Sequence, residues 1–141
     1  MKALLSLPLT VLPLIAYVLI VVSGRHPAGV DPFAAPVLAL DMVSGARFTM
    51  VLGDLLITAG LLVLFIEVLK ATRTGTVALA DHILSMLVFV AYLVAFLVFA
   101  PAATSVFFIL MAISLIDVVA GFSITISGAR RDFSVGPGNG H

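Results

Sequence analysis

The sequence predicts an all-α membrane protein, a bundle of four transmembrane helices with both termini on the cytoplasmic side. Of its 141 residues, 62% are hydrophobic and only 10% are charged, whereas a soluble domain has about 25% charged residues. A chain this small and this apolar cannot hide its hydrophobic surface in a water-soluble core, so its composition is typical of membrane proteins. Four apolar runs of about 20 residues or more are each long enough to cross a hydrocarbon layer of roughly 30 Å.

These runs define a single transmembrane domain over residues 1–128. The expected elements are spans at about 3–22, 47–69, 76–100 and 104–127, an outer loop at 24–46, and a flexible cytoplasmic tail at 129–141.

The first run, Ala3–Val22, has two interpretations. Its length favours a membrane span over the shorter apolar region of a secretory signal peptide, although Val21 and Ser23 fit the small-residue rule for cleavage. Pro8 and Pro13 should bend or weaken this helix, which membrane helices tolerate when neighbours satisfy the freed carbonyl groups.

The outer loop contains a predicted cap and an apolar segment. Asp31 and Pro32 are expected to start a short helix that Pro36 limits. Val37–Met42 is too apolar for a freely solvated loop and too short to span, so we expect it to lie on the membrane surface or on the other helices. It is either a lid or partner-docking loop, or a packed connector.

The remaining spans are joined by short turns that also fix the orientation. Residues 65–82 form a basic turn between the second and third spans, and Pro101 marks a tight turn between the third and fourth. Five basic residues lie on one side and two on the other, which places both termini in the cytoplasm. The inner residues are Lys2, Lys70, Arg73, Arg130 and Arg131, and the outer ones are Arg25 and Arg47.

Ionisable residues within the predicted spans are the candidate functional groups, because each is costly in a membrane and usually faces other helices or a wet cavity. Four of them lie toward the cytoplasmic half, with Asp117 near the midplane, and one lies in the outer half. They are Asp117, His82, Asp81 and Glu67 in the first group, and Asp54 in the second.

Small and polar residues at helical spacing predict how the helices pack. In the fourth span, Ser114, Asp117, Gly121 and Thr125 share one face. Such faces let membrane helices approach closely and form hydrogen bonds. Gly53 and Gly60, seven residues apart, provide a matching face on the second span, so we expect Asp117 to point into the bundle.

Two roles are open for these groups. Asp117 and His82 are either a proton or ion relay, or a buried Asp and His held by Ser and Thr hydroxyls. Glu67 and Lys70 are expected to pair one turn apart at the headgroups. Asp54 is expected to bond Thr58 or to meet Arg47 near the outer surface.

Several function classes lack their sequence signatures. The chain has no Cys and therefore no thiolate site. It has no paired His motif for a metal, no recognisable Ser or Thr catalytic arrangement and no phosphate-binding glycine loop. We therefore expect no enzyme activity, no metal and no cofactor, and the zero net charge gives no indication of nucleic acid.

Four short segments carry a resemblance to a known family. They are residues 53–56 with 65–73, and residues 117–122 with 129–133. From Arg47 onward the chain resembles an uncharacterised family of small four-span bacterial inner-membrane proteins. The resemblance implies a bacterial cytoplasmic membrane and implies no activity.

We therefore expect a small accessory or assembly subunit that docks on a larger inner-membrane complex. The alternative is a small oligomeric transporter or proton- or ion-conducting protein that uses Asp117 and His82. A further alternative is a lipid- or quinone-binding membrane protein. The expected partners are the lipid bilayer and either a membrane protein or further copies of the chain.

Overall fold

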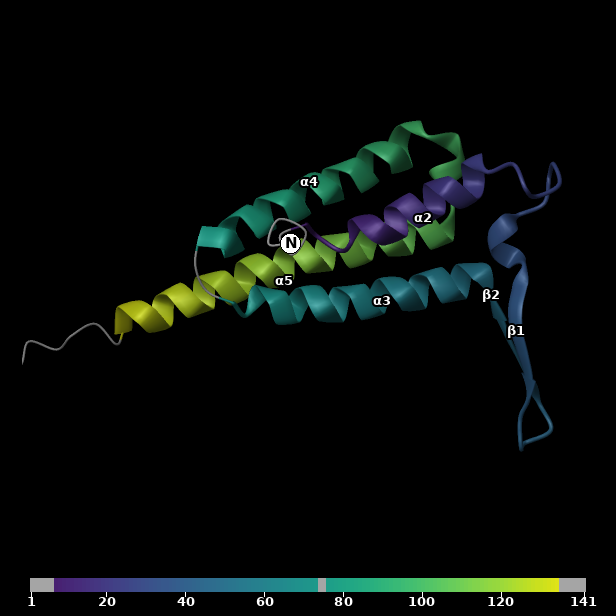
Figure 1. The fold of residues 1–141 in the computed structure, drawn as a ribbon, viewed down its shortest axis with the longest axis horizontal. Helices are drawn as coiled ribbons and strands as arrows, with labels where there is room; N and C mark the ends of the chain where they lie inside the picture. Colours follow the sequence, from purple (N-terminus) through teal and green to yellow (C-terminus); the bar gives the residue numbers. More distant parts are fainter. Residues whose placement is uncertain (1–6, 74–75, 135–141) are drawn as a thin grey trace, which may run out of the picture.

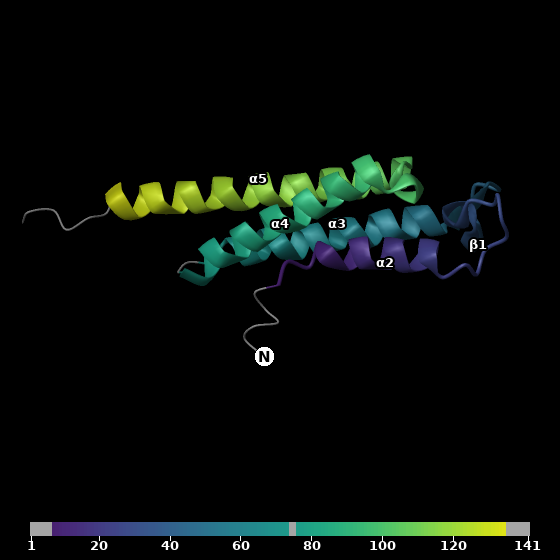
Figure 2. The ribbon, with the colours of Figure 1, turned by 90° about the horizontal axis from the view of Figure 1, so that it is seen from above.

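The computed structural model describes residues 7–73 and 76–134 of the chain. Its helices lie lengthwise beside one another, and a two-stranded sheet stands at one end, here called the hairpin end (Figure 1, Figure 2). The elements in chain order are α2 (Val11–Val22), η1 (Pro32–Ala34), β1 (Pro36–Asp41), β2 (Arg47–Val51), α3 (Leu52–Ala71), α4 (Thr76–Val98), η2 (Ala100–Ala102) and α5 (Ser105–Ser134).

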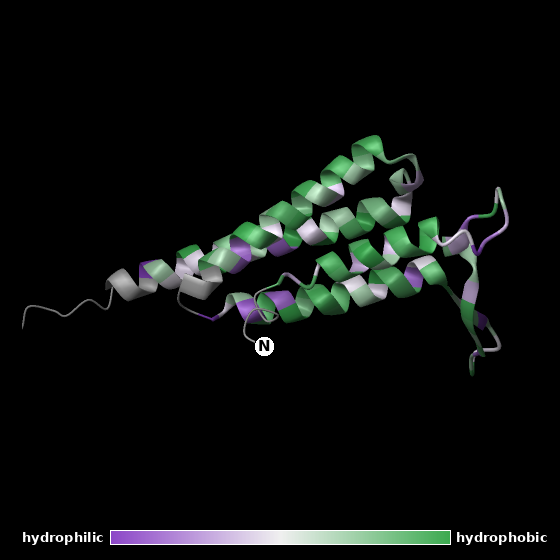
Figure 3. Cartoon of the chain, turned by 45° about the horizontal axis from the view of Figure 1, so that its top comes forward, coloured by the Kyte–Doolittle hydropathy of each residue, from purple (hydrophilic) through white to green (hydrophobic). Residues whose placement is uncertain are grey.

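Most residues of the helices are hydrophobic, as the colouring of Figure 3 shows. Within the described residues, three helical segments are long and apolar enough to cross a membrane: Leu52–Ala71, Leu79–Val98 and Ser105–Arg130. Because most of their large apolar side chains are exposed, these surfaces require a lipid or protein environment. The chain is therefore mainly helical, and three of its helices are typical of a membrane protein.

Helix α2 is shorter than the first predicted span. It has 12 residues, or about 18 Å at 1.5 Å per residue, and runs beside only the half of α5 nearest the hairpin end (Figure 1). Residues 7–10, expected to be helical, form a bend and a turn instead. Pro8 has no N–H to donate and disfavours a helical conformation at the residue before it. Residues 3–6 of the predicted span lie outside the described part.

The largest departure from the sequence-based prediction is the β-hairpin. The second span was expected from Arg47, but Arg47–Val51 is strand β2 and helix α3 starts at Leu52. All of β1 is exposed, so Val37–Met42 is not packed on the helices. The turn is a three-residue loop in which Gly45 has φ 85°, a left-handed conformation that favours glycine.

The connection before the hairpin contains the predicted cap. The Asp31 carboxylate accepts a hydrogen bond of 2.9 Å from the Phe33 N–H, and Pro32 is the first residue of η1. The prediction of a short capped helix is therefore confirmed. Phe33 is buried and stacks on Tyr17, with 4.4 Å between ring centroids, so η1 closes the bundle at the hairpin end.

The turn between α4 and α5 is held by Tyr17 of α2. The Tyr17 hydroxyl donates to the Pro101 carbonyl at 2.7 Å, and Thr104 Oγ1 lies 2.7 Å from the same hydroxyl. Thr104 Oγ1 also accepts from the Phe107 N–H, which is the pattern of a helix N-cap. Pro101 lies in η2, so the break between helices α4 and α5 is located where the sequence predicts it.

Helix α5 is longer than predicted. It continues to Ser134, through residues expected to belong to a tail, while 135–141 lie outside the described part.

The apolar core sits in the half of the bundle nearest the hairpin. It consists of Tyr17, Phe33, Leu56, Tyr92, Ala102, Phe107, Leu110 and Ile113.

Candidate functional site

A group of buried polar side chains lies beyond this core, where α2 begins. We call it the polar cluster. It draws on the segment before α2 and on α3, α4 and α5, and its members are Thr10, Glu67, Lys70, Asp81, His82, Ser85, Ser114 and Asp117. The structure thus brings together Asp117, His82, Asp81 and Glu67, four of the sequence-predicted candidates.

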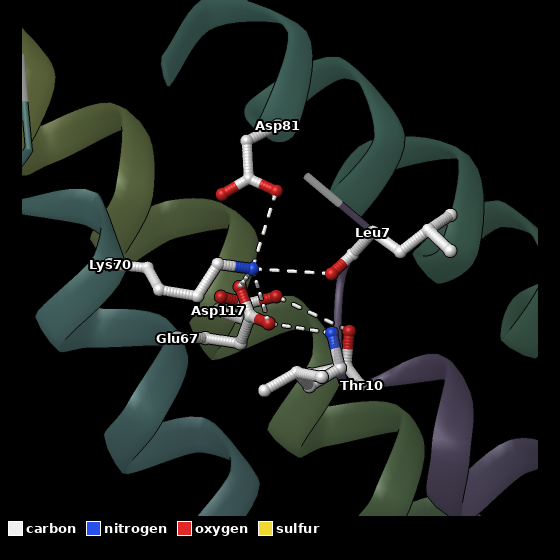
Figure 4. A network of polar contacts seen from close by, with 7 residues as sticks. Leu7, Thr10, Glu67, Lys70, Asp81 and Asp117 are labelled. Atoms are coloured by element: carbon white, nitrogen blue, oxygen red, sulfur yellow. Dashed lines mark hydrogen bonds and ion pairs between the residues drawn. The ribbon is translucent and has the colours of Figure 1, made fainter. Parts of the chain in front are cut away.

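Lys70 lies at the centre of the charged part of the cluster (Figure 4). Its Nζ is 3.1 Å from Glu67 Oε1 and 3.6 Å from Asp81 Oδ1, and it donates to the Leu7 carbonyl at 3.2 Å. The Glu67 and Lys70 side chains are 2% and 13% exposed. The predicted pair therefore forms, and it has further partners on α4 and on the segment before α2.

The cluster satisfies the irregular backbone that precedes α2. The Leu9 N–H donates to Glu67 Oε1, and the Thr10 carbonyl accepts from the Tyr92 hydroxyl at 2.8 Å. Lys70 binds the Leu7 carbonyl in the same segment. Buried backbone groups without regular helical bonds need other partners, so these bonds stabilise the segment before α2.

Asp117 faces the start of α2. Thr10 Oγ1 donates to Asp117 Oδ2 at 3.3 Å (Figure 4), and Ser85 also contacts the Asp117 carboxyl group. The carboxyl groups of Glu67 and Asp117 thus lie beside the N-terminal end of α2, where the unpaired N–H groups of a helix favour negative charge.

His82 closes the cluster on the side of α5. Its Nε2 is hydrogen-bonded to Thr125 Oγ1, and the same hydroxyl donates to the Gly121 carbonyl at 2.9 Å. A hydroxyl group has one hydrogen to donate, so His82 Nε2 is the donor in its bond to Thr125. A Cβ on Gly121 would lie 2.7 Å from His82 Nδ1, so this contact requires glycine.

Acidic side chains outnumber basic ones in the cluster. In the described part of the chain, the carboxyl groups of Glu67, Asp81 and Asp117 gather around a single ammonium group, that of Lys70. Among the described residues, two buried oxygen atoms have no hydrogen-bond partner: Ser114 Oγ, and Asp81 Oδ1, whose contact with Lys70 is an ion pair of 3.6 Å. Three carboxyl groups therefore share the neighbourhood of one ammonium group.

The remaining predicted residues lie elsewhere. Asp54 is exposed and accepts from the Val51 N–H at 3.4 Å, so it caps α3. The Thr58 hydroxyl bonds the Asp54 backbone carbonyl, and Arg47 lies 4.0 Å from Asp41 and not at Asp54. At Gly53 and Gly60, an added Cβ would come within 2.9 Å of Val106 and 3.1 Å of Leu110, so both are close-approach positions against α5.

Sequence reasoning missed two members of the cluster, Thr10 and Ser85. Thr10 is a single hydroxyl between Pro8 and Pro13 in an otherwise apolar run. That combination indicates backbone groups that need partners. Ser85 lies one helical turn from Asp81 and His82, on the same face of α4.

The hairpin forms a second candidate site. Leu38 pairs with Met50 and Leu40 with Phe48, whereas Ala39 pairs with Thr49 and Asp41 with Arg47. Because directly opposed residues share a face of the sheet, one face is apolar and the other is largely polar. Leu38, Leu40 and Phe48 are 41–50% exposed, so the apolar face is uncovered.

Neither a metal-binding group nor a similarity to known proteins helps to assign a function to these two sites. Among the described residues, no group of three or more His, Cys, Asp or Glu side chains is placed to hold a metal ion. No protein-family model matches the sequence, and neither the curated proteins nor the solved structures contain a significant match.

Proposed function

We propose that this chain is an accessory or assembly subunit that docks on a larger membrane protein complex through its β-hairpin. The observation that carries this proposal is the uncovered apolar face of the hairpin, formed by Leu38, Leu40, Phe48 and Met50. A partner that covers this face would remove apolar surface from water, which is the main driving force of association.

The position of the hairpin supports docking to a neighbour in the same membrane. Figure 1 shows β1 and β2 running crosswise to the helices and reaching past α3. In a membrane crossed by those helices, the hairpin lies along the surface and extends sideways beyond the bundle. An isolated two-stranded hairpin is marginally stable, and both strands have a free edge that a partner strand can join.

The proposal includes a topology. The membrane is a bacterial cytoplasmic membrane, α2 and the segment before it form a fourth crossing, and both termini are cytoplasmic. In support, Arg47 begins β2 and Arg25 lies in the connection from α2 to η1, whereas Arg73 follows the end of α3 that lies away from the hairpin (Figure 1). The excess of basic residues at that opposite end is typical of the cytoplasmic side.

The test compares the two faces of the hairpin. Tagged protein is extracted gently from native membranes, and the proteins that travel with it are quantified by mass spectrometry. We expect a stoichiometric partner for the unchanged chain and its loss in the variant Leu40→Ser/Phe48→Thr. The control, Ala39→Ser/Thr49→Ser, changes the same strands on the opposite face and should retain the partner. Identical partner sets for both variants would refute docking through this face.

A second function, proton or ion handling, is favoured by the excess of carboxyl groups in the polar cluster. The cluster holds three acidic residues and one lysine next to the N-terminal end of a half-length helix. This arrangement resembles the sites that broken helices form in transporters. Under this alternative, Asp117→Asn abolishes proton flux in liposomes without changing folding, whereas Asp54→Asn, at the exposed start of α3, has no effect. Equal flux in both variants would exclude Asp117 as a relay.

A further inference from the structure

A cavity of about 1090 Å³ lies at the hairpin end, between the last turns of α2 and the connection to η1. Its apolar lining includes Leu19, Val22, Val30 and Leu52. Because α2 ends at Val22, the cavity lies where the apolar part of the bundle meets the polar connection. In the topology proposed above, which places α2 across the membrane, this is the depth at which lipid headgroups join their acyl chains.

Charged groups stand at the polar side of the same cavity. Arg25 and Asp31 line it, together with His26, whose Nε2 lies 3.4 Å from the Val21 carbonyl. In the described part of the chain the Arg25 guanidinium forms no ion pair. One oxygen of Asp31 accepts from Phe33, which leaves the other oxygen available to a ligand.

We propose that this cavity binds a zwitterionic phospholipid from the adjacent leaflet. Arg25 binds the phosphate, Asp31 binds the headgroup ammonium, and an acyl chain lies against Leu19 and Val22. The lining carries one positive and one negative charge when His26 is neutral, so it complements a phosphate and an amine together. An anionic lipid leaves the Asp31 carboxylate next to its own negative charge, and like charges in close contact are unfavourable.

This site is independent of the proposed docking through the hairpin. Its lining includes no residue of the hairpin's apolar face. Loss of lipid binding therefore leaves partner docking in place, and loss of the partner leaves lipid binding in place.

The experiment measures lipid binding by native mass spectrometry of the full chain, released from detergent with added phosphatidylethanolamine or phosphatidylglycerol. We expect phosphatidylethanolamine to bind more tightly. Arg25→Gln should weaken this binding about tenfold, since it removes a charge-assisted hydrogen bond. Arg47→Gln removes the same charge from the hairpin, outside the cavity, and should leave binding unchanged.

Two further variants distinguish the cavity from general lipid adhesion. Asp31→Asn keeps an N-cap residue for η1 while removing the negative charge, so we expect the preference to shift toward phosphatidylglycerol. Ala34→Phe fills the cavity and should reduce the binding of both lipids. Equal lipid binding by the Arg25→Gln and Arg47→Gln variants, or an unchanged preference in Asp31→Asn, would overturn the proposal.

Discussion

At the scale of single residues, Lys70 is the group on which the polar cluster depends. It is the ammonium group that Glu67, Asp81 and the Leu7 carbonyl share. Removing one partner of a buried ion pair leaves an uncompensated charge. The free-energy cost of that charge is far larger than the net contribution of the intact pair to stability. Because Lys70 neutralises the buried Glu67, it is a structural requirement under either function of the cluster.

We predict that Lys70→Met destabilises the protein by about 3 kcal/mol, measured as the free energy of unfolding in detergent. The control is Arg73→Met, since Arg73 is exposed and forms no ion pair among the described residues. This variant should change the free energy of unfolding by less than about 0.5 kcal/mol. Similar losses in both variants would mean that the ion pairs of Lys70 contribute nothing.

The sequence located most of this site but could not show its contacts. Asp117, Gly121 and Thr125 were placed on one face of a helix by their spacing alone. The bonds of Glu67 to Leu9 and of Asp117 to Thr10 join residues 58 and 107 positions apart. No local pattern encodes such a distance, so the role of the cluster in holding the segment before α2 required the three-dimensional arrangement.

At the scale of elements, the contact between α4 and α5 depends on the absence of a side chain at Gly121. The His82 ring occupies the space in which a Cβ would stand. Gly128, on the same helix, has nothing within 4 Å of an added Cβ. The two glycines therefore form a matched pair for testing how closely the helices approach.

We predict that Gly121→Ala destabilises the protein, because overpacking costs about 1–3 kcal/mol and exceeds the gain of up to ~1 kcal/mol in helix propensity. Gly128→Ala should be neutral or slightly stabilising for the same propensity reason. The measurement is the melting temperature of each variant in one detergent. A higher melting temperature for Gly121→Ala than for the unchanged chain would contradict the observed contact with His82.

The elements also show where sequence patterns were ambiguous. The cap at Asp31 and the break at Pro101 were predictable, because each depends on a few adjacent residues. The hairpin was not predicted, although Ser44 and Gly45 form a turn signal. Strand β2 is followed directly by the apolar helix α3 at Leu52, with no helix-breaking residue between them. A prediction based on hydropathy therefore includes Arg47–Val51 in the second span.

At the scale of the whole molecule, the bundle has an apolar core at the hairpin end and a polar cluster farther along. The proposed orientation places the hairpin on the outer surface. Because the natural chain has no Cys, single cysteines can report which side each end faces.

We predict that Val43→Cys, at the exposed tip of the hairpin, reacts with a membrane-impermeant maleimide in intact cells. Arg73→Cys, at the opposite end, should react only after the membrane is opened. Labelling of Arg73→Cys in intact cells, with Val43→Cys protected, would reverse the proposed topology.

Docking through the hairpin is tested most directly by photocrosslinking in native membranes. A photoreactive amino acid is placed at Phe48 on the apolar face or at Thr49 on the opposite face, two adjacent positions of one strand. The account predicts a crosslink from position 48 to a distinct membrane protein and none from position 49. Crosslinks from position 48 only to lipid or to another copy of the chain would contradict the proposed accessory role.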